Sequence, residues 1–434
     1  MSVTISNSYL ASLLTGQPEL SVAFSSPTLA WLNRLRAEAV DRVGALTVPT
    51  TRDEDWRFTD ISSLTKIPFQ PARSAPLLDA TKIDDLVLPE AGARLVFVDG
   101  VYAPQLSFNK AGIVVENLAA GVTRHGAQME THLGRHAEFQ GNVFAALNTA
   151  FLRDGALIIV PRGVLAPPPV HLLFIATQQE AASYPRCLVV AEPGSSATII
   201  EDYVALTDAA YFTNAVSEIV LADDAHISHV RVQRDNGAAF HIANCAVSLA
   251  HASRYQSVSV ALGARISRYN LNVLHTAEGS ECAVDGLALI ADRQLADTHT
   301  CIDHAKPNGT SRQLHKCIVD GAAHAVFNGK IMVRQGAQHT DSSQSSRNLL
   351  LTGKARVDTK PQLEIFADDV KCAHGATVGQ LDGEEVFYLR SRGLSDAAAR
   401  NLLTYAFGAE IIDRIPIASL KHRLEQRVLE QTNR

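Results

Sequence analysis

The residues best suited to chemistry in this chain are a thiol and an imidazole, Cys372 and His374, which stand two positions apart within residues 370–379. Side chains at positions i and i+2 of an extended strand point to the same face. A soft metal or a metal–sulfur cluster accepts both kinds of ligand. A Cys-x-His pair is nevertheless more often an ordinary part of a half-buried strand, so the surrounding chain has to decide between these interpretations.

A second set of potential metal ligands comprises Cys301 with His304, and His315 with Cys317. Their spacing differs from the paired short loops that hold structural zinc. On strands, His315 and Cys317 would share a face, whereas Cys301 and His304 would not. The sequence therefore disfavours zinc. The cysteines other than Cys372 are expected to be packed strand residues: Cys187, Cys245, Cys282, Cys301 and Cys317.

Several common functional motifs are absent from the sequence. It contains no G-x-x-x-x-G-K-[ST] loop, so we expect no ATP site of the Walker type in this chain. It also contains no G-x-S-x-G nucleophile elbow. A net charge of -6 and a pI near 6.2 argue against nucleic acid as the main partner, because phosphate contacts need clustered Lys and Arg.

The totals describe a soluble globular protein that we expect in the cytoplasm. The 434 residues are 46% hydrophobic and 19% charged, which suits two or three domains or one long repetitive domain. No apolar run approaches the roughly 20 residues that span a bilayer. The first basic residue is Arg34, so neither a secretory signal nor an Arg-rich transit peptide is expected. Six cysteines scattered over a long chain indicate a reduced compartment.

The elements that would position Cys372 and His374 form a long array of strands. From about residue 155 to 390, apolar and polar residues alternate, as at Val258, Val260 and Leu262, and strand starts recur roughly every 12–16 residues. Such an array predicts a β-solenoid or a large sandwich. Its open edge would be a ready surface for pairing with another chain.

Helical patterns flank this array. Residues 1–50 are predicted to be helical, with a helix start at Ser26 and Pro27, and residues 127–152 are predicted to be helical as well. Between them, residues 95–102 predict a hairpin with an Asp-Gly turn. Beyond residue 392 two amphipathic helices are expected. This tail could equally pack on the body or receive a partner.

Five ordered motifs carry a resemblance to a known family. They are the stretches at residues 54–60 (EDWRFTD), 308–312 (NGTSR), 327–331 (FNGKI), 371–379 (KCAHGATVG) and 387–393 (FYLRSRG). In this order they resemble the SufB/SufD family of iron–sulfur cluster assembly proteins over roughly residues 52 to 415.

Two positions make the pattern similar to the SufD branch of that family. SufB-like proteins carry His-Glu where this chain has His374 and Gly375, and they carry a Cys ahead of the Leu-rich strand, where this chain has Ser346. Both differences remove a cluster ligand or acid expected of SufB and leave the SufD-type His.

The resemblance implies a mainly β architecture, a right-handed parallel β-helix flanked by N-terminal and C-terminal helical regions. The corresponding domains are an N-terminal region at 1–150, a β-helix core at 151–391 and a C-terminal helical domain at 392–434. It further implies pairing with SufB along the β-helix strand edges. The C-terminal domain would dock the ATPase SufC, and the isolated chain could form a homodimer.

The function that the resemblance implies is that of a scaffold subunit of the SUF complex, not an enzyme, which also contributes to iron acquisition. A nascent iron–sulfur cluster, or iron, would be held transiently and shared with SufB. His374 is the residue carried over as a cluster and iron ligand, with Cys372 as its neighbour. Because one His gives too few ligands for a stable cluster, a transient shared site is expected.

Two other functions stay open at this point. One is a stand-alone β-solenoid enzyme, for example one that acts on polysaccharide, and the other is a purely structural solenoid. The enzyme would need carboxylates gathered on one face of the solenoid. The acids at Asp285, Asp292, Asp297 and Asp303 are scattered among turns rather than regularly spaced, which disfavours it.

Overall fold

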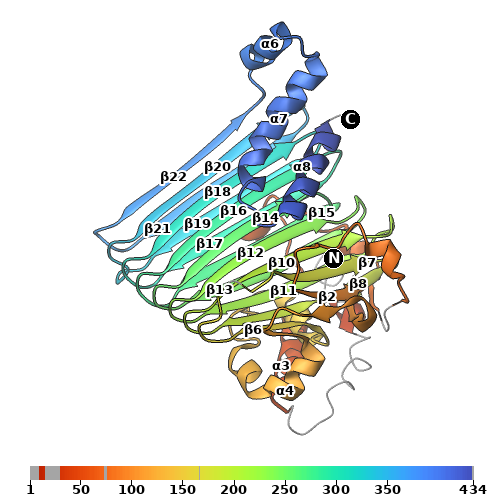
Figure 1. Cartoon of the computed structure of the whole chain (residues 1–434), viewed down its shortest axis with the longest axis vertical. Helices are drawn as coiled ribbons and strands as arrows, with labels where there is room; N and C mark the ends of the chain where they lie inside the picture. The colour runs from red at the N-terminus through yellow and green to blue at the C-terminus, as the bar shows by residue number, and fades with distance from the viewer. Residues whose placement is uncertain (1–8, 15–29, 73–75, 166, 433–434) are drawn as a thin grey trace.

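Two 11-stranded sheets form the body of the molecule, and the chain alternates between them to wind a β-solenoid (Figure 1). The computed structural model describes residues 9–14, 30–72, 76–165 and 167–432. The mainly β fold with helices at both ends confirms the sequence prediction. No helix in these ranges is long and apolar enough to cross a membrane.

Sheet A contains the odd-numbered strands from β9 to β21 together with β6, and these strands pair in parallel. Its strands are β21 (Arg356–Ile365), β19 (His324–Val333), β17 (Leu295–His304), β15 (Ile266–His275), β13 (Phe240–Leu249), β11 (Phe212–Leu221), β9 (Arg186–Ala191), β6 (Gly155–Val160) and β5 (Val114–Asn117), with β8 (Ala181–Ser183) and β1 (Gln70–Pro71) beside β11.

Sheet B contains the strands that lie between these along the chain. They are β22 (Lys371–Gly379), β20 (Asp341–Leu350), β18 (Thr310–Val319), β16 (Glu281–Ile290), β14 (Arg254–Ala261), β12 (His226–Arg234), β10 (Ser196–Ala205), β7 (Val170–Ala176), β2 (Ala93–Val98) and β3 (Val101–Tyr102), with β4 (Phe108–Asn109) beside β2.

Neighbouring strands within each sheet pair residue for residue, so one position of each turn stacks on the same position of the next. In sheet A, for example, Asn270 pairs with His299 and His299 pairs with Asn328. Because side chains alternate between the two faces of a strand, every second position points into the lumen between the sheets. The lumen of the first turns contains apolar residues such as Ile199, Ile227 and Val247, together with a buried polar group around Glu201 and His229.

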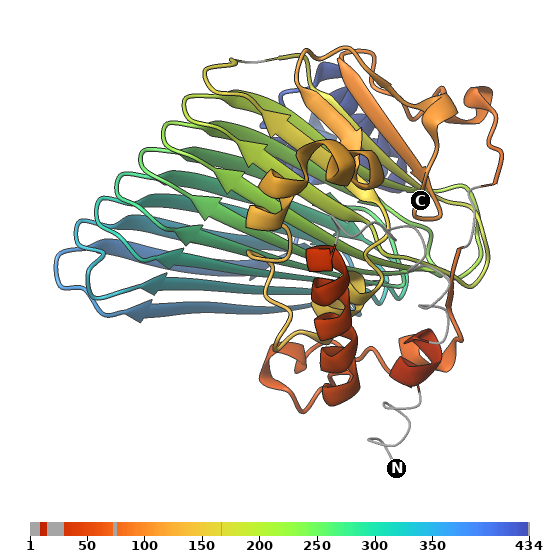
Figure 2. The ribbon, with the colours of Figure 1, turned by 90° about the horizontal axis from the view of Figure 1, so that it is seen from below.

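Helices from both ends of the chain pack on the outer faces of this body. The N-terminal helices α3 (Ala30–Ala45), α4 (Leu118–His132) and α5 (Val143–Ala150) lie over its first turns (Figure 2). The C-terminal helices are α6 (Gly383–Ser391), α7 (Asp396–Ile412) and α8 (Ala418–Thr432). Short 3-10 helices complete the set: η3 (Glu54–Trp56), η4 (Leu64–Lys66), η5 (Ala80–Ile83) and η6 (Pro104–Leu106).

Most expected elements are present, and one boundary differs from the expected one. The hairpin is formed by β2 and β3, with Asp99 and Gly100 both at positive φ in its turn. The predicted helix start at Ser26 and Pro27 lies outside the described residues. The strand array ends at Gly379, and α6 occupies residues that we had assigned to the β-helix.

The predicted helix over residues 127–152 is two helices, α4 and α5, with a loop between them. The reason is a carboxylate on a distant strand: Glu218 of β11 accepts hydrogen bonds from the backbone N–H groups of Gly134, His136 and Ala137. A continuous helix would use these donors internally. Gly134 also has a φ of 74°, which a helix does not contain.

Candidate functional site

The end of the solenoid carries the Cys-x-His pair on its last strand, β22. In the described chain, β22 pairs with β20 alone and β21 pairs with β19 alone, so both sheets end in a free edge at the same turn. His374 is exposed and Cys372 is half-buried. The Cys-x-His pair therefore lies on the surface of the last turn and not within the stack.

Both side chains of the pair are on the lumen side of β22. Cys372 packs against the buried residues Ile331 and Val333 of β19 across the lumen. His374 shares this orientation because it is two residues further along the strand. Its register partner on β20, Gln344, is buried. The structure thus brings together the two residues that the sequence singled out.

The thiol of the pair is not activated in the isolated chain. Burial raises the pKa of Cys372, so the neutral thiol predominates at neutral pH. A thiolate at this position would need a cation or a metal close by. In this turn the exposed imidazole of His374 is accordingly the better first ligand.

The lumen directly below the pair is polar. The buried side chains of Gln344, Gln313 and His315 on β20 and β18 each hold at least one nitrogen or oxygen without a hydrogen-bond partner. Gln313 accepts from the Thr300 hydroxyl at 2.8 Å. In the first turns, by contrast, the buried carboxylate of Glu201 accepts hydrogen bonds from Ser217 and Tyr203.

The other predicted metal ligands do not meet. His304 and Cys317 are buried on the lumen side of their strands, while Cys301 is half-buried and faces outward. Burial lowers the pKa of His304 to about 4 and that of His315 to about 3, so both rings are neutral at pH 7. No group of three or more His, Cys, Asp or Glu in the described ranges is arranged to hold a metal ion.

The N-terminal motif at residues 54–60 is anchored on the outer face of sheet A. The guanidinium of Arg268 lies over the indole ring of Trp56, with its Cζ atom 4.0 Å from the ring centroid. Arg268 donates to Asp297 at 2.7 Å and to the carbonyl of Asp55 at 2.6 Å. Thr59 donates to Asp297 at 2.6 Å. The motif therefore fastens the N-terminal segment to β15 and β17.

Sequence reasoning missed a cleft of about 740 Å³ between this N-terminal segment and sheet A. Its floor contains Asn244, Asn270 and Asn328, which occupy the same position of three turns, together with His299 and Cys301 of β17. A comparison of successive turns, residue by residue, would have found this recurrence of amide side chains.

The C-terminal helices are fixed to sheet B by charged contacts. Lys316 of β18 is buried, lies 2.5 Å from Glu410, donates to the carbonyl of Phe407 and stands 4.4 Å from its ring. Arg414 reaches Asp285 of β16 at 2.6 Å. These contacts bind α7 rigidly to the strands that precede the last turn.

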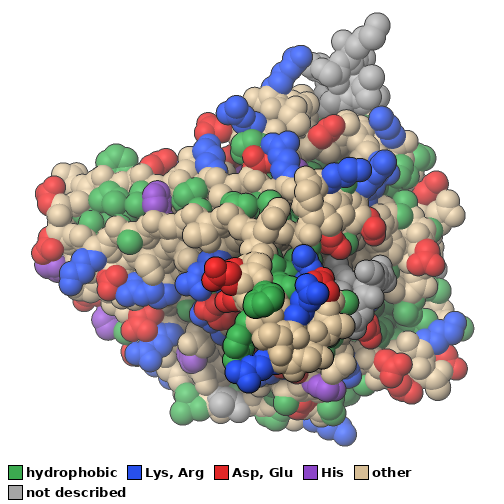
Figure 3. Space-filling model, turned by 90° about the horizontal axis from the view of Figure 1, so that it is seen from above, with side chains coloured by type: hydrophobic (Ala, Val, Ile, Leu, Met, Phe, Trp, Pro, Cys, Tyr) green, Lys and Arg blue, Asp and Glu red, His purple; other side chains and the backbone are tan. Residues whose placement is uncertain are grey.

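The arm formed by α6 has the opposite character. It follows β22 after three residues and extends away from the sheets (Figure 1). Phe387 is 71% exposed and Tyr388 is 56% exposed. On this side of the molecule, hydrophobic side chains lie beside acidic and basic ones (Figure 3). Exposed aromatic side chains on a protruding helix are typical of a protein-binding surface.

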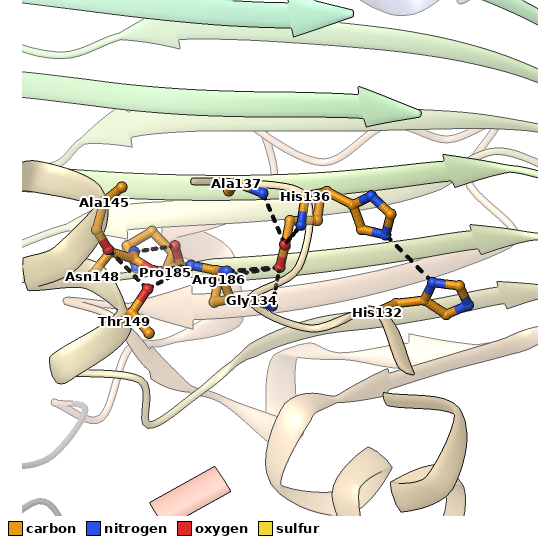
Figure 4. A network of polar contacts seen from close by, with 10 residues as sticks. His132, Gly134, His136, Ala137, Ala145, Asn148, Thr149, Pro185 and Arg186 are labelled. Atoms are coloured by element: carbon orange, nitrogen blue, oxygen red, sulfur yellow. Dashed lines mark hydrogen bonds and ion pairs between the residues drawn. The ribbon is translucent and has the colours of Figure 1, made fainter. Parts of the chain in front are cut away.

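A buried ion pair holds the N-terminal region to the first turns (Figure 4). Arg186 of β9 and Glu218 of β11 are both fully buried, and their Nη2 and carboxylate oxygen lie 2.7 Å apart. Arg186 also donates to Asn148 and Thr149 of α5. Burial would raise the pKa of Glu218, but the charge of Arg186 and three backbone donors lower it.

Comparisons with known proteins agree with this arrangement. The SufBD protein N-terminal region matches residues 19–172, and the domain described as SUF system FeS cluster assembly, SufBD core domain, matches residues 174–407.

Similar curated proteins carry the same description. An iron–sulfur cluster assembly SufBD family protein of Synechocystis is 43% identical over 406 residues, which cover 90% of this chain and 89% of that protein. The iron–sulfur cluster assembly protein SufD of Escherichia coli is 36% identical over 88% of both chains. SufD of Bacillus subtilis is 26% identical over 91% of this chain and 92% of its own.

Proposed function

Since this chain belongs to the SufB/SufD family of iron–sulfur cluster assembly proteins, on its SufD branch, we propose that it is a non-catalytic scaffold subunit of the SUF complex. In this proposal it pairs with SufB through the free edge of its last turn. It also presents His374 to iron, or to a nascent cluster, at that interface.

The observation that carries this proposal is the free edge itself, with His374 exposed on it. An edge strand offers a row of unpaired backbone donors and acceptors. Here β21 and β22 offer two such rows side by side, one from each sheet. A partner solenoid with the same ending could therefore continue both sheets across the interface.

The number of ligands explains why the site would be shared. An iron–sulfur cluster is usually held by four protein ligands, and this chain supplies one exposed imidazole and one half-buried thiol at the edge. The remaining ligands would come from SufB. Iron or the cluster would then be cargo, held while the interface is formed and released when it opens.

In this proposal the C-terminal helices transmit ATP-driven movement of SufC to the last turn of the solenoid. In our proposal the exposed Phe387 and Tyr388 belong to the surface that docks SufC. Because α7 is fixed to β16 and β18 and α6 continues directly from β22, a movement of SufC would be transmitted to the last turn. Dimerisation of SufC on ATP binding could thereby open or close the interface.

The test of strand pairing uses the direction of the backbone groups on β22. The N–H of Lys371 donates to the carbonyl of Thr340 on β20. Backbone groups alternate sides along a parallel strand, so the N–H groups of Cys372, His374 and Ala376 point to the free edge. Proline is tolerated on an edge strand where its missing N–H would face outward.

We therefore predict that Ala376→Pro leaves the chain folded but abolishes its stable complex with SufB. Ala376→Val, which keeps the N–H, is the matched control and should pair normally. Co-expression with SufB and SufC followed by size-exclusion chromatography measures the complex. Full assembly by a folded Ala376→Pro variant would refute pairing through this edge.

A further inference from the structure

Gln344 is a buried polar residue of the last turns whose side-chain hydrogen bonding is incomplete. Its side chain is 3% exposed, and neither its oxygen nor its nitrogen has a hydrogen-bond partner in the described structure. A buried polar group left unpaired costs about 1–3 kcal/mol. Buried polar groups that lack a partner within a structure call for an explanation in function or in bound water.

The position of Gln344 relative to His374 follows from the strand register. Gln344 is the direct partner of His374, and Gln313 is the partner of Gln344 one strand further in. Adjacent strands lie about 4.8 Å apart, so the side chains of Gln344 and His374 are stacked neighbours on the lumen side. The amide of Gln344 is thus within reach of the imidazole.

The opposite wall of the lumen restricts where this amide can go. Gly329 of β19 faces Gln344, and a Cβ atom at Gly329 would lie 2.1 Å from the Gln344 Nε2 atom. The side chain of Gln344 therefore crosses the lumen only because residue 329 is glycine. The amide is held against this backbone, and the neighbouring strand on its other side is β22, where His374 is its register partner.

We propose that Gln344 is a positioning residue for His374: its Oε1 accepts a hydrogen bond from Nδ1–H of the imidazole when the ring turns toward the lumen. The other nitrogen, Nε2, is then unprotonated and directed out of the mouth of the lumen toward an iron ion. This inference rests on the proposed role of His374 as a ligand. Metal-binding histidines commonly donate their second N–H in this way, which fixes both tautomer and ring orientation.

The competing explanation is that water in the lumen satisfies Gln344 without any effect on His374. The matched control for it is Gln313, which is also buried and carries an unpaired amide nitrogen, but lies one strand further from His374. A general disturbance of the polar lumen should affect Gln313→Leu and Gln344→Leu alike. Orientation of His374 should depend on Gln344 alone.

The first measurement is the tautomer of His374 in the metal-free chain. The 16 histidines are labelled with ¹⁵N, and the His374 signals are identified by their loss in His374→Ala. At about pH 8.5 the wild type should hold the Nδ1–H tautomer. Gln344→Leu should shift it toward Nε2–H, whereas Gln344→Glu, which keeps an acceptor oxygen, and Gln313→Leu should not.

The second measurement is Fe²⁺ affinity in the complex with SufB and SufC. Gln344→Leu should weaken binding about 10- to 100-fold, and Gln344→Glu should restore it. An unchanged tautomer in a folded Gln344→Leu variant overturns the positioning role. If the tautomer shifts as expected but His374→Ala binds iron and assembles clusters normally, the proposed function fails and the Gln344–His374 contact stands.

Discussion

The buried pair of Arg186 and Glu218 allows the attachment of the N-terminal region to the solenoid to be measured. Glu218→Leu removes the carboxylate that pairs with Arg186 and that accepts from the N–H groups of Gly134, His136 and Ala137. An uncompensated buried charge costs about 3–5 kcal/mol, and each orphaned buried donor adds about 1–3 kcal/mol. Because Ala137 is itself buried, we count its N–H as one orphaned donor and expect the free energy of unfolding to fall by about 4–8 kcal/mol.

Arg186→Met should cost less, about 3 kcal/mol, because Glu218 keeps its three backbone donors. The double variant carries no buried charge at this site. It should therefore be more stable than the sum of the single effects predicts, by about 1–3 kcal/mol.

Urea unfolding followed by two signals measures these effects. Trp31 packs beside Leu118, Met129 and Leu133, so its fluorescence reports on the N-terminal region, while circular dichroism reports mainly on the strands. In Glu218→Leu the fluorescence transition should precede the loss of strand signal. The pair should also lose its contribution as pH falls, because the pKa of Glu218 is lowered in the folded chain.

Additivity would refute this reasoning. If the double variant loses the sum of the two single effects to within about 0.5 kcal/mol, then Arg186 and Glu218 do not act as a pair. Coincident fluorescence and circular dichroism transitions in Glu218→Leu would show that the pair does not hold the N-terminal region in particular.

Two further predictions concern the contacts on the outer faces of the sheets. Burial would raise the pKa of Asp297, but Arg268 and His299 lower it to about 2, so its contribution to stability is present at neutral pH and lost between about pH 4 and 2. The acid-induced change in Trp56 fluorescence should therefore be absent in Asp297→Asn. The same change in Asp297→Asn as in the wild type would show that the pair of Asp297 and Arg268 is unimportant. Lys316→Met should leave the solenoid folded but loosen α7 by about 2 kcal/mol, because the ion pair with Glu410, one hydrogen bond and one cation–π contact are lost. Amide hydrogen exchange in α7 should accelerate, and unchanged exchange would contradict this prediction.

The fold was predictable from the sequence because alternation at period two leaves few choices for a long chain. Strands such as β14 follow the pattern directly, although the apolar row of Val258 and Val260 is buried against the C-terminal helices and not in the lumen. Strands such as β9 and β6 are buried on both faces, because α4 covers their outer side. This burial depends on tertiary packing, and the sequences of β6 and β9 accordingly show no alternation of apolar and polar residues.

The break between α4 and α5 was not predictable for a similar reason. The local sequence is compatible with a helix, and its interruption depends on Glu218, whose position in space follows only from the winding of the solenoid. Local propensity was overridden by a buried carboxylate more than 80 residues away along the chain.

The candidate site was predictable in part. The shared face of Cys372 and His374 follows from their spacing on one strand. The place of Gln344 beside His374 could not be predicted in this way. It depends on the register between β20 and β22, which is set by the length of the whole solenoid turn that connects them. The outer cleft was missed because its asparagines recur only when successive turns are compared.

The most direct test of the central claim is anaerobic cluster reconstitution on the complex of this chain with SufB and SufC. The account predicts that His374→Ala forms the complete complex but gives a much weaker iron–sulfur absorbance band than the wild type. His251→Ala, which changes an exposed histidine far from the last turn, should reconstitute normally. A full absorbance band from the His374→Ala complex would contradict the account.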